Sequence, residues 1–317
     1  RAWGILAWAA LSVPVIVPVL LGQGATDSAT VQRANQIHVY ERLPHHLVPH
    51  SMSMTNRIRF AVLVGAWLLM RVFSRPPLAM HRFQNVVGAT LLIAGMGTLV
   101  DLATLSTPAA GAAILKYYWF RLSDVLIPAG LGLGLLHLVL QHRPNYPRWS
   151  ETALVGILLL TAGCLARDFL AHRGDRRPRA DQQGDFGLGS THRDGWQAFL
   201  DWRDACAWAR EATDASQLFL TPTRSQTFKW YAERPEFATW KDCPQDPRGI
   251  LAWRERIEAV RKLGLYQPDS PVTAEGLRAF AVQHGVNYVV VVRPWLPELR
   301  GLAPAFRNDT FDIYRMP

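Results

Sequence analysis

The pattern of apolar and polar positions divides the chain into two halves. Five apolar stretches fill most of the first half, at about residues 2–21, 58–74, 83–103, 122–140 and 152–170. A helix of about 20 apolar residues crosses roughly 30 Å of hydrocarbon. The pattern therefore predicts an α-helical transmembrane bundle of about five spans. The second stretch is the weakest of the five, because Arg59 and Arg71 must extend their charges toward the membrane surface.

The second half has the pattern of a soluble α/β domain. Residues 171–192 mix Arg, Asp, Gln and Gly and predict a linker. The β-branched run at 287–292 is typical of a strand that is buried on both faces, and 310–315 alternates like an edge strand. A third strand is expected at 217–220, and helices at 196–211, 225–233, 249–263 and 273–284. Alternating helices and strands predict a small three-layer α/β domain over 193–317.

The positions of the basic residues are typical of a membrane protein rather than of a nucleic-acid-binding surface. The mean hydropathy of +0.02 averages two unlike halves, and the net charge is +9. Arginines gather at the ends of the apolar segments, where membrane proteins commonly carry them. We therefore expect membrane lipid, and no nucleic acid, as a partner. The chain begins with Arg1 inside an apolar run, so we interpret it as the C-terminal part of a longer protein.

Short basic loops predict the orientation of the spans. Arg71, Arg75 and Arg82 follow the second span, and Arg143 and Arg148 follow the fourth, which places both loops in the cytoplasm. Residues 22–56, 106–116 and 193–317 are then extracytoplasmic. In such a compartment Cys206 and Cys243 could form a disulfide, and two free thiols are the alternative.

The first outer loop contains a cluster of histidines framed by prolines. It runs from Tyr40 to His50 and includes Arg42, His45 and His46. Proline disfavours helix for the residue before it, so we expect an extended backbone on which adjacent histidines point to opposite sides. Such a pair is poorly placed to share one metal ion, and no metal site is expected. The cluster could instead bind a phosphate or carry a proton, and the alternative is a loop packed on the bilayer surface.

A second polar cluster precedes the fourth span. Lys116, Arg121 and Asp124 lie among tyrosines and a tryptophan that favour the membrane interface. Arg121 and Asp124 could pair at helical spacing, or Lys116 and Arg121 could contact a lipid phosphate. The glycines at 130, 132 and 134 predict close helix packing.

Aromatic and basic residues alternate in the soluble half. They are Lys229, Trp230, Tyr231, Arg234, Trp240 and Lys241. Flat rings beside cations suit sugars or anionic head groups, whereas the alternative places the rings in the core and the cations in solvent. The strands deliver residues 221–224 and 293–295 to the sheet edge where α/β proteins usually bind ligands. No Gly-rich phosphate loop, nucleophile elbow or zinc signature is present in this half.

Several phrases of the sequence resemble a known group of membrane proteins. They are residues 43–47 (LPHHL), 118–124 (YWFRLSD), 208–213 (WAREAT), 228–234 (FKWYAER), 240–244 (WKDCP) and 253–256 (WRER), with Thr221-Pro222 between them. Together they resemble uncharacterised bacterial multi-spanning proteins related to the GT-C class of membrane glycosyltransferases.

The resemblance implies sugar transfer from a polyprenyl-phosphate donor, with an acidic catalytic residue in an outer loop before Arg1. The chain would then lie in the bacterial inner membrane. No catalytic residue can be assigned here, because Glu41, Asp101 and Asp124 do not match that acid. No cofactor is expected in this fragment, and a divalent metal would belong to the full-length protein.

Two other functions are consistent with the same residues. One is a non-catalytic, membrane-anchored module that binds envelope glycan or lipid. The other is a transporter, which we rank third because charges lie only at the ends of the later spans.

Overall fold

The computed structural model describes residues 27–317, apart from 174–176, 184–191, 268–269, 297–298 and 300. The chain divides into two compact units, Arg1–Asp168 and Phe169–Pro317, and each is described by itself. The first expected span, residues 2–21, lies outside the described residues.

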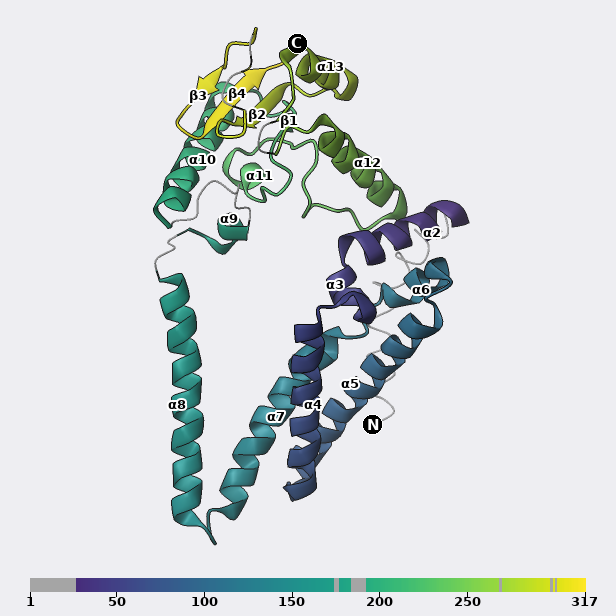
Figure 1. Cartoon of the computed structure of the whole chain (residues 1–317), viewed down its shortest axis with the longest axis vertical. Coiled ribbons are helices and arrows are strands. Elements are labelled where there is room, and N and C mark those ends of the chain that lie inside the picture. Colours follow the sequence, from purple (N-terminus) through teal and green to yellow (C-terminus); the bar gives the residue numbers. More distant parts are fainter. Residues whose placement is uncertain (1–26, 174–176, 184–191, 268–269, 297–298, 300) are drawn as a thin grey trace. The chain divides into compact units, whose positions relative to one another are not determined.

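The first unit is helical (Figure 1). Its elements are α2 (Ser28–Gln36), the π-helix η1 (Ile37–Arg42), α3 (Pro44–Leu47), the 3₁₀ turn η2 (Pro49–Ser51), α4 (Met54–Phe73), α5 (Leu78–Ala103), α6 (Pro108–Leu115), α7 (Arg121–His142) and α8 (Pro147–His172). Three of the described helices, α5, α7 and α8, are long and apolar enough to cross a membrane. α4 has 20 residues but carries Arg57, Arg59 and Arg71, and it does not qualify by composition.

α4, α5 and α7 pack together around a small apolar cluster. Trp67 from α4, Val87 from α5 and Ile127 from α7 are buried there. Gln84 joins the three helices, since it accepts a hydrogen bond from Trp67 Nε1 (2.6 Å) and donates to the carbonyl of Gly130 (2.8 Å). Such bonds between helices satisfy polar groups that lipid cannot.

The glycines of α7 have different surroundings. A Cβ atom at Gly130 would lie 2.8 Å from Cγ2 of Val87, and one at Gly134 would collide with Met70. Gly132 has no neighbouring atom within 4 Å of such a position. The predicted close packing is therefore confirmed for Gly130 and Gly134 and wrong for Gly132.

The two ends of the bundle carry different structures. At one end, the backbone N–H of Arg75 in the α4–α5 connection donates to the Gln141 side chain near the end of α7 (2.7 Å). The opposite end of α4, α5 and α7 carries η1, α3, η2 and α6 (Figure 1).

The second unit combines helices with a mixed sheet. Its elements are α9 (Arg179–Gln183), α10 (His192–Ala212), β1 (Phe219–Leu220), α11 (Phe228–Tyr231), α12 (Pro247–Leu263), α13 (Ala274–His284), β2 (Tyr288–Val292), β3 (Phe306–Arg307) and β4 (Phe311–Arg315). The strand order is β1-β2-β4-β3, with β1 parallel to β2 and the other pairs antiparallel.

The prediction that 310–315 forms an edge strand is wrong, because β4 lies between β2 and β3. The alternation of polar and apolar residues over 310–315 is typical of a strand with one exposed face. In the structure Asp312 is fully buried and accepts two hydrogen bonds of 2.8 Å from Arg307 on β3. The two-residue β3 was too short to be recognised from its sequence.

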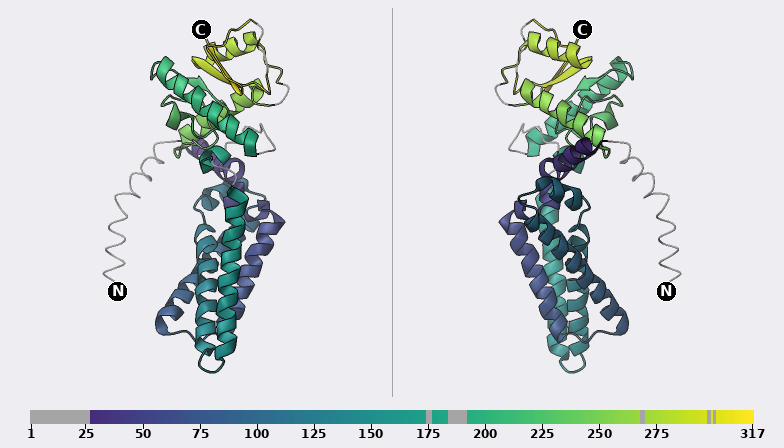
Figure 2. Two further views of the ribbon diagram at one scale, coloured as in Figure 1. Left: turned by 90° about the vertical axis from the view of Figure 1, so that its left-hand side faces the viewer. Right: turned by 90° about the vertical axis from the view of Figure 1, so that its right-hand side faces the viewer.

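The sheet is covered on both faces. Tyr288, Val290 and Val292 pack in one core with Trp202 of α10, and Figure 2 shows α10 running alongside the strands. The alternate residues of β2 are buried as well, which confirms the prediction of a strand buried on both faces. The stretch predicted as a linker contains α9, whose Asp181 accepts a hydrogen bond from the Thr227 hydroxyl (2.7 Å).

Candidate functional site

A groove of about 680 Å³ lies in the helical unit. It is bounded by α3, η2, α4, α5 and α7. Its polar lining includes His45, His46, Asn56, Arg57 and Asp124. Its apolar lining includes Phe60, Ala61, Val64, Leu91 and Ala94. The groove therefore combines a polar region with an apolar wall built on long helices.

The two histidines lie side by side, and the prediction that they point apart on an extended backbone is wrong. They belong to the short helix α3, and their ring centroids are 4.2 Å apart. Each flanking proline restricts only the residue before it. Those residues are Leu43 and Val48, which lie just outside α3, so the backbone of the histidines is free to be helical.

The polar region of the groove contains groups of opposite charge. Burial, followed by the charges of His45 and Arg121, lowers the pKa of His46, so this imidazole is neutral at pH 7. Arg57 is exposed and contributes a permanent positive charge. Asp124 from α7 contributes a carboxyl group. The imidazole of His46 and the guanidinium of Arg57 can together donate several hydrogen bonds to one phosphate.

The other residues of the two predicted clusters do not line the groove. Lys116 follows α6 and donates to the Asn35 side chain of α2 (3.3 Å). The Arg121 guanidinium lies over the ring of Tyr118, 5.8 Å from its centroid, and no ion pair joins Arg121 to Asp124 in the described part of the chain. Arg42 is the last residue of η1. The structure thus brings together three of the six residues, namely His45, His46 and Asp124.

A second cleft of about 400 Å³ lies at the same end of the bundle. Asp101, near the end of α5, is buried and accepts hydrogen bonds from the backbone N–H (3.0 Å) and Nδ1 (2.8 Å) of His50. These bonds hold the imidazole of His50 against the end of α5. Pro49 and Thr98 line the groove, one and three residues from this pair along the chain.

In the second unit, the tryptophans of the aromatic and basic stretches are exposed. Trp230 is 59% exposed and Trp240 is 36% exposed. Core packing, the alternative drawn from the sequence, is therefore wrong for Trp230. Trp240 packs on Trp253 at 5.3 Å between ring centroids, and Lys241 is exposed beside it.

The remaining three residues of that set have structural contacts. Arg234 donates to the carbonyl groups of Arg210 (2.6 Å) and Thr213 (2.5 Å) at the end of α10. The Tyr231 hydroxyl donates to Asp181 (2.9 Å). Lys229 forms an ion pair of 2.6 Å with Asp242.

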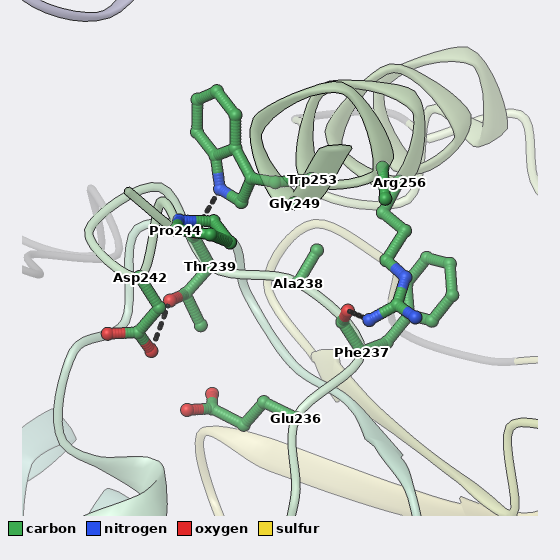
Figure 3. A pocket seen from close by; sticks show the side chains of 10 residues that line it. Glu236, Phe237, Ala238, Thr239, Asp242, Pro244, Gly249, Trp253 and Arg256 are labelled. Atoms are coloured by element: carbon green, nitrogen blue, oxygen red, sulfur yellow. Dashed lines mark hydrogen bonds between the residues drawn. The ribbon is translucent and has the colours of Figure 1, made fainter. Parts of the chain in front are cut away.

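A pocket of about 290 Å³ lies in the second unit (Figure 3). It is lined by Glu236, Phe237, Ala238, Thr239, Asp242, Pro244, Gly249, Ala252, Trp253 and Arg256. The Trp253 indole N–H donates to the carbonyl of Thr239 (2.8 Å), which holds the loop against α12. In Figure 3 the carboxyl groups of Glu236 and Asp242 lie on one side of the pocket and Arg256 lies on the other.

Glu236 is the titratable group of this pocket that its surroundings perturb most. Burial raises its pKa from 4.5 to about 7, although a hydrogen bond from the Thr221 hydroxyl (2.5 Å) opposes the shift. Thr221 directly follows β1, so the predicted ligand edge of the sheet reaches this pocket. A carboxyl group that changes charge near neutral pH and lines a pocket is a candidate for binding or proton transfer.

Metal and disulfide chemistry find no support in the described residues. No group of three or more His, Cys, Asp or Glu side chains there could hold a metal ion. No disulfide joins Cys206 to Cys243, and Cys206 is buried in the core of the second unit.

Comparison with known proteins gives one match. Residues 200–260 match the model of a domain of unknown function, DUF6798. This segment contains every residue that lines the Glu236 pocket. No curated protein and no solved structure matches the chain.

Sequence reasoning missed Arg57 of the groove and Glu236 of the pocket. Arg57 lies in the first turn of α4, which begins after the N-cap Ser53. A positively charged residue in the first turn of a helix is a sequence signal that could have identified Arg57 as a candidate. Glu236 sits between Pro235 and Phe237 in an irregular segment, where no periodic pattern indicates burial.

Proposed function

We propose that the groove binds the phosphate and the first part of the acyl or prenyl chain of a membrane lipid. The chain would act as the lipid-handling part of a GT-C-like integral membrane protein that uses a polyprenyl-phosphate-linked sugar. The observation that carries the proposal is the amphipathic lining of the groove. His45, His46 and Arg57 could meet a phosphate, while Phe60 and Leu91 could meet the hydrocarbon chain.

The position of the groove on long apolar helices supports a lipid as the occupant. α5 and α7 both contribute to its wall and are both candidate spans. A ligand would enter the groove from the bilayer, so the groove needs no water-filled entrance. The transfer of a sugar is supported by the resemblance of the sequence phrases. We further propose that the polar region of the groove and residues 193–317 face the extracytoplasmic side of the bacterial inner membrane.

A non-catalytic lipid-binding module is the second candidate, because the same groove would serve it. The two functions differ in whether the lipid-linked sugar is converted into a product. A glycosyltransferase would incorporate radiolabelled sugar from a polyprenyl-phosphate donor into a product, whereas a binding module would retain the lipid unchanged.

Lipid retention by the full chain tests the proposal. The protein would be purified in a non-ionic detergent, mixed with a polyprenyl phosphate and analysed by native mass spectrometry. Arg57→Gln should weaken retention roughly tenfold, since a hydrogen bond to a charged group contributes about 1.5–3 kcal/mol. Arg82→Gln is the matched control, because Arg82 is exposed near the start of α5, away from the groove lining. Equal retention by the wild-type protein and Arg57→Gln would exclude the groove as the lipid site.

A further inference from the structure

The Glu236 pocket contains a hydrogen-bonding group without a partner. Oε1 of Glu236 accepts the hydrogen bond from Thr221, but Oε2 is shut off from solvent and has no hydrogen-bond partner among the described residues. Asp242 differs, because its two oxygens accept from Lys229 (2.6 Å) and Thr239 (2.8 Å). Buried polar atoms are nearly always paired, so the second oxygen of Glu236 calls for a donor that the described chain does not provide.

The other side of the pocket offers unused donors. Arg256, on α12, is exposed, and its guanidinium lies 5.5 Å from the centroid of the Phe237 ring. Among the described residues its one hydrogen bond is a long one, from Nη1 to the Phe237 carbonyl (3.4 Å). A guanidinium has five N–H donors in a planar fork that suits carboxylate and phosphate groups. Arg256 therefore has donors available for an anionic group.

The two sides of the pocket thus differ in charge. The carboxyl groups of Glu236 and Asp242 lie at one side and the guanidinium of Arg256 at the other (Figure 3). A simple cation would satisfy Glu236 but would lie near Arg256, and a simple anion would face two carboxyl groups. A molecule with both charges meets each side with the opposite sign.

We propose that this pocket binds a small zwitterion. Its ammonium group meets the carboxylate of Glu236, and its acidic group accepts from Arg256. The volume of about 290 Å³ suits a molecule of a few heavy atoms. The site lies wholly in the second unit, and it does not depend on the lipid groove.

Binding to the full chain in a non-ionic detergent tests the site. The probes are phosphoethanolamine and γ-aminobutyrate, which separate a phosphate from a carboxylate as the acidic group. Ethylamine and inorganic phosphate each carry one of the two charges. Fluorescence of the tryptophans, with Trp253 in the pocket wall, reports occupancy. At least one zwitterion should bind ten or more times more tightly than either single-charge probe.

Variants then assign the binding to this pocket. Glu236→Gln and Arg256→Gln should each weaken zwitterion binding at least tenfold. Glu255→Gln should leave it unchanged, because Glu255 is an exposed neighbour on α12 that does not line the pocket. The proposal fails if no zwitterion binds, if single-charge probes bind equally well, or if both pocket variants bind like the wild-type protein.

The pH dependence of binding provides a measurement on the unaltered protein. The charged and titratable groups that act on Glu236 are Asp242 and Lys229, and Tyr266 and Cys206 lie within its electrostatic influence. An ammonium group needs the ionised carboxylate, so affinity should rise about tenfold from pH 6 to pH 8. Affinity that falls over this interval would mean that the protonated acid binds an anion, and it would overturn the proposal.

Discussion

At the residue scale, the charge of Glu236 should control the stability of the second unit. Burial raises the pKa of Glu236 from 4.5 to about 7, so the folded chain holds this proton more tightly than the unfolded chain does. The stabilisation is fully present below pH 4.5 and is lost as the pH rises to about 7. The free energy of unfolding should fall by about 3 kcal/mol over that interval through this group.

Hydrogen exchange of the β2 amides in the full chain measures this effect. In Glu236→Gln the side chain cannot ionise, so the fall attributed to Glu236 should disappear, while Glu255→Gln should keep it. A wild-type protein and a Glu236→Gln variant with parallel stability profiles from pH 4 to pH 8 would show that Glu236 ionises normally.

At the element scale, α7 packs through particular glycines rather than through its whole Gly-rich run. Gly130→Ala should destabilise the bundle by about 1–3 kcal/mol, because the new methyl group meets Val87, whose branched side chain has few rotamers. Gly134→Ala should cost less, since the flexible side chain of Met70 can move away. Thermal loss of helical circular dichroism in detergent measures both variants.

Gly132→Ala is the matched control for this comparison. Its Cβ position is open, and alanine favours helix more than glycine does, so the variant should be neutral or slightly more stable. Equal melting temperatures for Gly130→Ala and Gly132→Ala would mean that α7 does not approach α5 as closely as the structure shows.

Elements were predictable where one periodic pattern dominates the sequence. The structure has helices over the apolar runs at 83–103, 122–140 and 152–170, each extended by a few residues. The N-cap role of Thr273 is also as predicted, since its hydroxyl accepts from the N–H of Gly276 (3.2 Å). Errors arose where local chemistry competes with the pattern, as in α3, where each proline acts only on the residue before it. β4 was misplaced because the two-residue strand β3 covers its edge, where Arg307, five residues earlier in the chain, pairs with the buried Asp312.

At the scale of the whole molecule, the candidate sites were less predictable than the elements. The groove takes its lining from α3, η2, α4, α5 and α7, and the sequence gives no distance between these elements. His45, His46 and Asp124 were singled out by residue type, whereas Arg57 became visible only once α4 and α3 were placed together. The Glu236 pocket depends on an irregular segment that packs on α12, and on a hydroxyl from the end of β1. Hydropathy predicts the place of the chain in a membrane, but site geometry comes from tertiary packing.

The orientation of the whole chain leads to a prediction about thiol labelling in intact cells. The basic α4–α5 and α7–α8 connections should be cytoplasmic, so Arg75→Cys and Tyr146→Cys should react with a membrane-impermeant maleimide only after permeabilisation. The half-buried Cys243 should react from outside. Cys206 should stay unlabelled throughout, because burial shields it and raises the pKa of its thiol. Labelling of Arg75→Cys in intact cells, with Cys243 protected, would reverse the orientation and place the second unit in the cytoplasm.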